Sequence, residues 1–281
     1  MYKALNAGAI GVKVSGLADA IGKATAHGFG GIEIDPAEVA QIGPEKVRAM
    51  LDQACLRAAG WGLPVDWRGS EEKWREDLKA LPHLAQAASA VGCTRCSTWV
   101  LPMSDEKPFA ENRQHHIERF KPIADILREH GCSLGLEFIG PKTLRDRGKH
   151  PFIHTMGDML ELGEEIGPNV GLLLDCWHWY TSGGTVEEIE ALMPDRVVYV
   201  HVNDAPEGVK VDEQVDNVRC LPGETGVIDI KRFLQALKRI GYNGPVVAEP
   251  FKKELNELPS DDDRLATVAK SLDKIFVEAE L

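Results

Sequence analysis

Four short apolar segments of this chain each deliver one side chain that can bind a metal ion. The segments are SLGLEF with Glu137, GLLLD with Asp175, VVYVHVN with His201 and PVVAEPF with Glu249. Short, continuously apolar runs predict strands buried on both faces, as in a parallel sheet that is covered by helices. A carboxylate at the end of such a strand needs a cation or several hydrogen-bond donors, because an unpaired buried charge is costly. One such residue fits a hydrogen-bonding role in the core, whereas four together favour one shared cation.

Predicted strands alternate with predicted helices along the whole chain. The strands are expected at residues 4–9, 31–35, 61–67, 94–101, 133–139, from 170 onward, 197–203 and 244–249. The helices are expected at residues 17–27, 44–59, 71–91, 109–130, 156–166, 185–192, 228–240 and from 263 onward, with Pro82 kinking or splitting the third of them. Eight alternations without a linker predict a single (β/α)8 TIM barrel domain over residues 1–281.

An open, doubly wound sheet is the alternative fold for such an alternation. It would carry a glycine fingerprint, Gly-x-Gly-x-x-Gly, between a strand and a helix, and this chain has none. In a barrel, the C-terminal ends of all strands open on one face. The four candidate ligands are therefore expected to converge there from neighbouring strands.

Composition narrows the class of partner. The chain has 44 acidic and 32 basic residues, a formal net charge of −12, which disfavours nucleic acid and anionic membranes as partners. No apolar run reaches the ~18 residues of a membrane span, and the first residues lack the pattern of a signal peptide, so we expect a cytoplasmic protein. The six cysteines, Cys93-x-x-Cys96 among them, fit core thiols better than a disulfide framework or a redox pair.

Motifs between Leu134 and Phe251 make the chain recognisable. They are Glu137 in GLEF, Asp175-x-x-His178, His201-Val-Asn-Asp204, Arg219-x-x-Pro-Gly-Glu224 followed by Gly226-x-Ile-Asp229, and Glu249 in AEPF. Together they resemble the xylose isomerase-like barrel superfamily, and within it the sugar phosphate isomerase/epimerase group with its ketose 3-epimerases and inosose-metabolising enzymes. The resemblance implies a small carbohydrate as substrate and a homo-oligomeric protein.

The resemblance also implies a metal cofactor and a reaction. Glu137, Asp175, His201 and Glu249 match residues that hold one divalent cation. Three carboxylates and one imidazole favour Mn²⁺ or Mg²⁺ by ligand hardness, and Zn²⁺ or Co²⁺ are compatible. Such enzymes isomerise or epimerise a sugar, sugar phosphate or keto-polyol by removing a proton next to a carbonyl, through a metal-stabilised enediolate. Glu137 and Glu249 would be the catalytic pair, one removing the proton and the other returning it.

Other residues are candidates for substrate contact. His178 and Arg219 match substrate-binding residues of the family, and a guanidinium suits vicinal oxygens; a structural histidine and a solvated surface arginine are the alternatives. Trp99 and Trp177 could wall a sugar site or belong to the core. Glu33 and Asp35 suit a structural role as well as substrate contact. The basic loop 142–150 could hold a phosphate or carboxylate, although a solvated loop is the simpler interpretation.

Three further functions compete with an isomerase. A lyase or dehydratase acting on an inosose-like keto-polyol begins with the same proton abstraction, so the sequence does not separate it from an epimerase. An abasic-site endonuclease of the same superfamily would need a trinuclear zinc cluster with additional histidines, which are missing near residues 61–66, 99–102 and 219–224. A non-catalytic sugar-binding barrel is disfavoured because all four ligands are present.

Overall fold

The computed structural model describes residues 1–281. Eight parallel strands close into a barrel in the order β1, β10, β9, β8, β6, β4, β3, β2. Their bounds are β1 Tyr2–Leu5, β2 Gly31–Glu33, β3 Arg57–Gly62, β4 Arg95–Val100, β6 Ser133–Phe138, β8 Val170–Asp175, β9 Val197–Val202 and β10 Pro245–Ala248. This closed parallel barrel confirms the predicted (β/α)8 fold.

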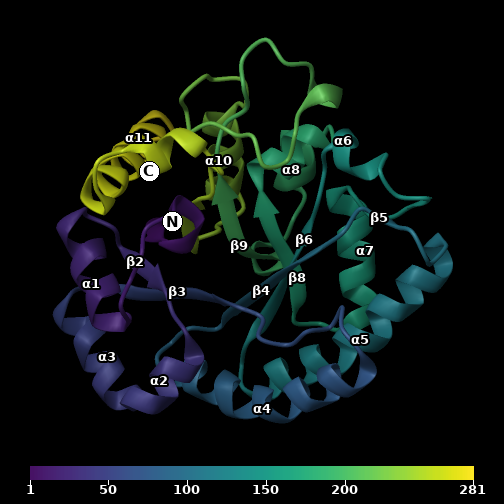
Figure 1. Cartoon of the computed structure of the whole chain (residues 1–281), viewed down its shortest axis with the longest axis horizontal. Coiled ribbons are helices and arrows are strands. Elements are labelled where there is room, and N and C mark those ends of the chain that lie inside the picture. The colour runs from purple at the N-terminus through teal and green to yellow at the C-terminus, as the bar shows by residue number, and fades with distance from the viewer.

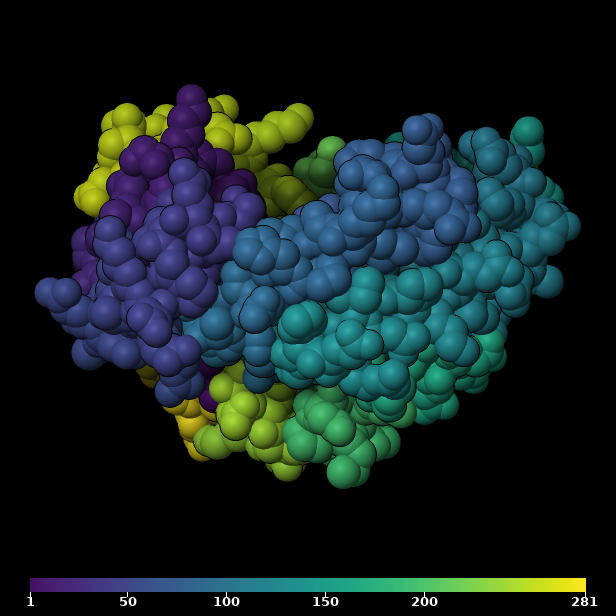
Figure 2. Space-filling view, turned by 90° about the horizontal axis from the view of Figure 1, so that it is seen from below, coloured from purple at the N-terminus to yellow at the C-terminus, as the bar shows by residue number.

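Helices surround the barrel on its outside (Figure 1). They are α1 Leu17–Ala26, α2 Pro36–Ile42, α3 Pro44–Gln53, α4 Glu71–Ala90, α5 Phe109–Glu129, α6 Lys142–Arg145, α7 Met156–Ile166, α8 Cys176–Thr181, α9 Val186–Glu190, α10 Ile230–Arg239 and α11 Asp261–Glu278. A two-stranded antiparallel sheet of β5, Met103–Ser104, and β7, His150–Pro151, lies outside the barrel. Seen from below, the segments that include α3, α4 and α5 form a continuous wall in blue and teal (Figure 2). None of the helices has the length and apolar composition that crossing a membrane requires.

Two apolar clusters hold the fold together. The larger joins the outer faces of the strands to the helices, as burial of both sheet faces requires. The smaller consists of Ala4, Ala59, Leu173, Tyr199 and Val247, contributed by five barrel strands. Small residues make room for the Tyr199 ring, since a Cβ built on Gly60 would lie 2.5 Å from that ring. The core therefore depends on small residues as much as on large ones.

Several element boundaries differ from the sequence prediction. The third strand is Arg57–Gly62 and not 61–67, and the helix expected over 44–59 ends at Gln53, because Cys55 has a left-handed backbone with φ 55°. The first strand occupies residues 2–5 and not 4–9, with a 3₁₀ turn at Gly8–Ile10 after it. Helix α4 continues through Pro82 without splitting. Helix α2 was not predicted; the Asp35 side chain caps it and Pro36 begins it.

Candidate functional site

The four predicted metal ligands come from neighbouring strands at one end of the barrel. Glu137 lies on β6, Asp175 ends β8, His201 lies on β9, and Glu249 follows β10 directly. Asp175 pairs with His201 across β8 and β9, and the Glu249 backbone N–H donates to the Val202 carbonyl at 3.1 Å. Register thus brings the four side chains to matching depth, at the C-terminal end where barrel enzymes carry their active sites.

These four side chains form one group that could hold a metal ion. One ligand atom from each lies within 4.8 Å of the others. The Nδ1 of His201 is 3.6 Å from Glu137 Oε1 and 3.4 Å from Glu249 Oε2. Both His201 Nδ1 and Glu137 Oε1 are buried without a hydrogen-bond partner, which is unusual because buried polar atoms are normally paired. Two buried, unpartnered ligand atoms facing each other, with two further carboxylates beside them, fit a divalent cation.

In the metal-free protein, the two glutamates of this group differ in pKa. Burial, together with the nearby Glu249 charge, raises the pKa of Glu137 to about 8. Burial would also raise the pKa of Glu249, but the charges of His201 and Arg219 outweigh it and hold that pKa below its ordinary value. Burial opposes charge on His201, yet Glu249 and Glu137 raise the pKa of this imidazole well above its usual range. Without a metal, the imidazolium is therefore the cation between two carboxyl groups, and a metal ion must displace its proton.

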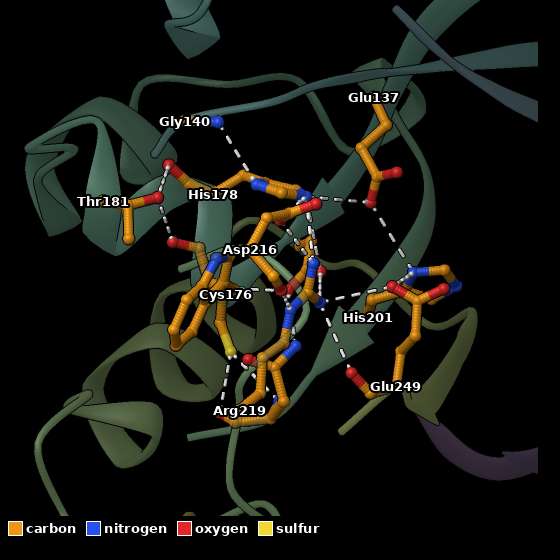
Figure 3. A network of polar contacts seen from close by, with 12 residues as sticks. Glu137, Gly140, Cys176, His178, Thr181, His201, Asp216, Arg219 and Glu249 are labelled. Carbon is orange, nitrogen blue, oxygen red and sulfur yellow. Dashed lines mark hydrogen bonds and ion pairs between the residues drawn. The ribbon is translucent and has the colours of Figure 1, made fainter. Parts of the chain in front are cut away.

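Arg219 donates hydrogen bonds to two of the four candidate ligands and to Asp216 (Figure 3). Its Nη1 donates to Asp175 Oδ2 at 2.7 Å and to Glu249 Oε2 at 3.2 Å. Its Nη2 donates to Asp216 Oδ1 at 3.0 Å, and Nε donates to the Asp216 carbonyl at 2.7 Å. The residue is only 4% exposed. Arg219 is therefore not a solvated surface arginine, which was the alternative interpretation of the sequence. It is a buried cation that holds two ligand carboxylates in place.

His178 faces the same group from helix α8, which begins directly after Asp175. The Asp175 side chain caps this helix by accepting from Trp177 N–H at 2.8 Å. The Gly140 N–H donates to His178 Nδ1 at 3.2 Å, so the neutral ring carries its proton on Nε2. That Nε2 is 4.0 Å from Glu137 Oε1 and 3.8 Å from Asp216 Oδ1. His178 therefore presents Nε2–H to a space bordered by Glu137, by Asp216 and by Arg219, whose Nη2 is 3.4 Å away.

The buried His178 should make the stability of the metal-free protein depend on pH. Burial lowers the pKa of His178 to about 3, against an ordinary value of about 6.5. A lowered pKa of a base contributes stability that is fully present above about pH 6.5 and is lost as pH falls toward 3. Urea unfolding from pH 7 to 4 should show the wild type losing a few kcal/mol more than His178→Gln, at ~1.4 kcal/mol per pKa unit. Parallel curves for the two proteins would contradict this assignment.

Gly140 fixes the position of His178 by its lack of a side chain. A Cβ built on Gly140 would lie 2.4 Å from the His178 carbonyl oxygen and 2.5 Å from Thr181 Oγ1. Gly140→Ala should therefore displace α8, lower the free energy of unfolding by about 1–3 kcal/mol and weaken any activity that uses His178. Gly157→Ala is the matched control, because nothing lies within 4 Å of its added Cβ. Urea denaturation of both variants measures the difference, and equal stability would show that α8 absorbs the methyl group.

A cavity of about 330 Å³ opens above the group. The two catalytic candidates, Glu137 and Glu249, line this cavity together with His178 and Arg219. The full lining is Trp99, Leu101, Glu137, Ile139, Leu144, His178, Asp216, Arg219, Glu249 and Phe251. Trp99 is 43% exposed, and the Arg68 guanidinium covers one face of its ring, with its carbon 3.7 Å from the ring centre. Trp177, also predicted to touch substrate, is fully buried and does not line this cavity; its ring centre lies 5.2 Å from the Arg219 guanidinium carbon. The structure thus places Trp99 at the site and Trp177 in the packing behind Arg219.

The remaining candidates have structural partners. Glu33 accepts from the Tyr199 hydroxyl at 2.8 Å inside the barrel. The exposed Asp35 caps α2 by accepting from Ala37 N–H at 2.9 Å. Within the basic loop 142–150, Lys142 donates to Asp212 at 3.3 Å. The residue of this loop that lines the cavity is the apolar Leu144. Cys93 and Cys96 are free and buried, as expected of core thiols.

Two residues with structural contacts at the site were given no role by the sequence prediction, Asp216 and Asp204. Asp216 lies in the long loop after β9 and borders the cavity beside Arg219. Asp204 holds the base of that loop, because its carboxylate accepts from the backbone N–H groups of Thr225, Gly226 and Ile228 at 2.7–3.0 Å. The spacing Asp216-x-x-Arg219 was the available signal for Asp216. Asp204 lies in the motif His201-Val-Asn-Asp204, whose local pattern does not reveal these loop contacts.

A family model described as xylose isomerase-like TIM barrel matches residues 21–275. An inosose isomerase of Halalkalibacterium halodurans is 31% identical over 68% of this chain and 65% of its own length. An L-ribulose 3-epimerase of Methylomonas sp. is 25% identical over 86% of this chain and 80% of its own. A 3-dehydroshikimate dehydratase of Pseudomonas putida is 30% identical over 48% of this chain and 21% of its own length. The matched part spans less than two thirds of the inosose isomerases.

Solved structures share the fold. A xylose isomerase domain protein from Alicyclobacillus acidocaldarius superimposes with a TM-score of 0.86 and 31% identity, over 99% of both chains. The IOLI protein with a bound zinc atom superimposes with a TM-score of 0.79 and 20% identity, again over 99% of both chains. Almost the whole chain thus has the same barrel fold as these two proteins.

Proposed function

Because this chain belongs to the xylose isomerase-like TIM barrel family, we propose that it is a divalent-metal-dependent sugar isomerase or epimerase. The observation that carries the proposal is the convergence of Glu137, Asp175, His201 and Glu249 within 4.8 Å of one another. Both glutamates also line the cavity that His178 and Arg219 border. Relatives named inosose isomerase and L-ribulose 3-epimerase support the same class of reaction.

The four-ligand group would hold the metal ion. A divalent cation bound there supplies a Lewis acid that polarises a substrate carbonyl and stabilises the negative charge that develops when a neighbouring proton leaves. Hard oxygen ligands outnumber the single imidazole, so we propose Mn²⁺ or Mg²⁺ as the native ion, with Zn²⁺ and Co²⁺ as competitors in vitro.

The protein's own residues would divide the proton transfer between them. Glu249, whose pKa lies below its ordinary value, is the ionised carboxylate and would take the proton next to the carbonyl. Glu137, the other glutamate that lines the cavity, would return a proton to the same carbon.

The rest of the cavity wall would orient the substrate. His178 Nε2–H and the Arg219 guanidinium supply donors for hydroxyl and carbonyl oxygens. The exposed Trp99 ring offers an apolar face to the C–H face of a sugar. A cavity of about 330 Å³ suits a small carbohydrate and not a polymer. We propose a ketose, ketose phosphate or inosose as the substrate class.

A dehydratase is the second candidate. It begins with the same proton abstraction and then expels a hydroxyl group instead of returning the proton. The match to a 3-dehydroshikimate dehydratase favours it, although that match covers 48% of this chain and 21% of the relative. The two candidates differ in the fate of the substrate and not in the residues that remove the proton.

Solvent exchange tests the proposal. The metal-loaded protein is incubated in D₂O with ketoses, ketose phosphates and inososes, and NMR follows deuterium at the carbon beside the carbonyl. We expect exchange with at least one of these classes, followed by an epimer or aldose for an isomerase, or loss of water for a dehydratase. Absence of exchange across the panel with a fully loaded protein would refute proton abstraction at this site.

A further inference from the structure

A second, larger cavity lies at the end of the barrel opposite the four-ligand group. Its volume is about 690 Å³, roughly twice that of the cavity above Glu137 and Glu249. It is bordered by Arg48 on α3, Arg57 at the start of β3 and Arg95 at the start of β4. Strand starts define the N-terminal face of a barrel, which ordinarily serves stability and not catalysis. A second hollow of about 360 Å³ adjoins it through Thr94, Arg95 and Asn243.

The three arginines of this cavity, Arg48, Arg57 and Arg95, have no carboxylate partner. Arg48 donates to the Ala90 carbonyl, and Arg95 donates to the Val198 carbonyl at 2.9 Å. The Arg57 guanidinium lies 4.7 Å from the centre of the Tyr2 ring. No ion pair within 4.0 Å involves any of the three, although other arginines, such as Arg196 with Glu164 at 3.1 Å, form such pairs. Three unpaired guanidinium groups around one hollow thus stand out in a chain with a net charge of −12.

The balance of charge on the lining favours an anion. Asp52 is the one acidic side chain there, against three guanidinium groups. The Thr94 hydroxyl and the Asn243 amide add neutral hydrogen-bonding groups. Guanidinium groups bind phosphate oxygens through paired N–H donors, and they keep their charge at all physiological pH values. The volume lies within the usual range for small-molecule sites.

From this arrangement we propose that the N-terminal cavity binds a small organic phosphate that carries at least two negative charges. The concave shape of the cavity and the net charge of −12 of the chain disfavour a nucleic acid strand, which needs an extended basic track. The site is separate from the four-ligand group, so it does not depend on the reaction proposed above. Occupancy would link the starts of β3 and β4 to helix α3 through one ligand.

Titration calorimetry at low ionic strength tests the proposal, with ATP and inorganic pyrophosphate as probes. The wild type should bind at least one probe with a Kd below about 1 mM, and added salt should weaken the binding. The double variant Arg48→Gln/Arg57→Gln should bind at least tenfold more weakly. Both side chains are exposed, so the variant should fold, which circular dichroism checks. Lys46→Gln, an exposed cation on the same helix that does not line the cavity, is the matched control and should bind as the wild type does.

Glu249→Gln separates this site from the catalytic one. Probe binding should survive that substitution, since Glu249 borders the other cavity. Failure of both probes to bind the wild type, or equal binding by the double variant, would overturn the proposal. Loss of binding in Glu249→Gln would also overturn it, because the probe would then occupy the catalytic cavity. Neither result bears on solvent exchange, so the two proposals fail independently.

Discussion

Glu249→Gln should lower turnover by about 10³-fold or more and leave the fold intact. The substitution removes the ionised carboxylate that we assign as the base, and general acid–base catalysis alone contributes about 10²–10⁴-fold. It also replaces a charged metal ligand by a neutral amide. Glutamine has nearly the same shape, and Arg219 keeps its contacts to Asp175 and Asp216. Steady-state kinetics and solvent exchange, with circular dichroism for folding, measure the effect.

Glu137→Gln should have an effect of similar size, because turnover needs one glutamate to remove the proton and the other to supply its replacement. Glu254→Gln is the matched control, since this exposed glutamate lies near the site without lining the cavity. Its turnover should equal that of the wild type. Retained activity in either Glu137→Gln or Glu249→Gln would remove the two-base mechanism.

Asp175→Ala should give the largest loss of stability among the site variants. Asp175 is completely buried, and its carboxylate accepts from Arg219 at 2.7 Å, from Trp177 N–H at 2.8 Å and from Asn203 at 2.9 Å. Removing this carboxylate leaves the charge of the buried Arg219 with one partner fewer, and it leaves α8 without its N-cap. Breaking a buried ion pair costs about 3–5 kcal/mol. Urea denaturation of the metal-free protein measures the loss, and metal titration should show weaker binding.

Two further variants separate the causes of that loss. Asp216→Ala removes a partly exposed partner of the same arginine and should cost about 1 kcal/mol or less. Asp175→Asn keeps an oxygen that can cap α8 while losing the charge, so its stability should lie between those of Asp175→Ala and the wild type. Equal destabilisation by Asp216→Ala and Asp175→Ala would contradict the assignment of the buried Asp175 as the main charge partner of Arg219.

The sequence predicted the parts of the fold that long apolar strands determine. Strands β6, β8 and β9 are largely apolar and were placed nearly correctly, and the ligands at or next to their last residues converge as expected: Glu137, Asp175 and His201. Strand β3 was misplaced because its residues are mostly Ala and Gly, which carry little strand preference. Those small residues are required by the Tyr199 ring inside the barrel, a contact between distant strands that local pattern does not reveal.

The site was predictable to the extent that strands carry it. Residues on loops depend on contacts that are distant in sequence. Trp177 is turned into the core because α8 starts immediately after Asp175, and Asp216 reaches Arg219 because Asp204 ties down the loop. Local periodicity contains neither contact, so the sequence suggested a substrate role for Trp177 and none for Asp216.

The metal content of the purified and reconstituted protein tests the central claim most directly. Elemental analysis of the wild type and of Asp175→Ala should be made after dialysis against chelator and reloading with Mn²⁺, Mg²⁺, Zn²⁺ or Co²⁺. The four-ligand group predicts about one equivalent of a divalent ion in the wild type and a strongly reduced amount in the variant. No bound metal after reconstitution, or about three zinc ions per chain, would contradict the account.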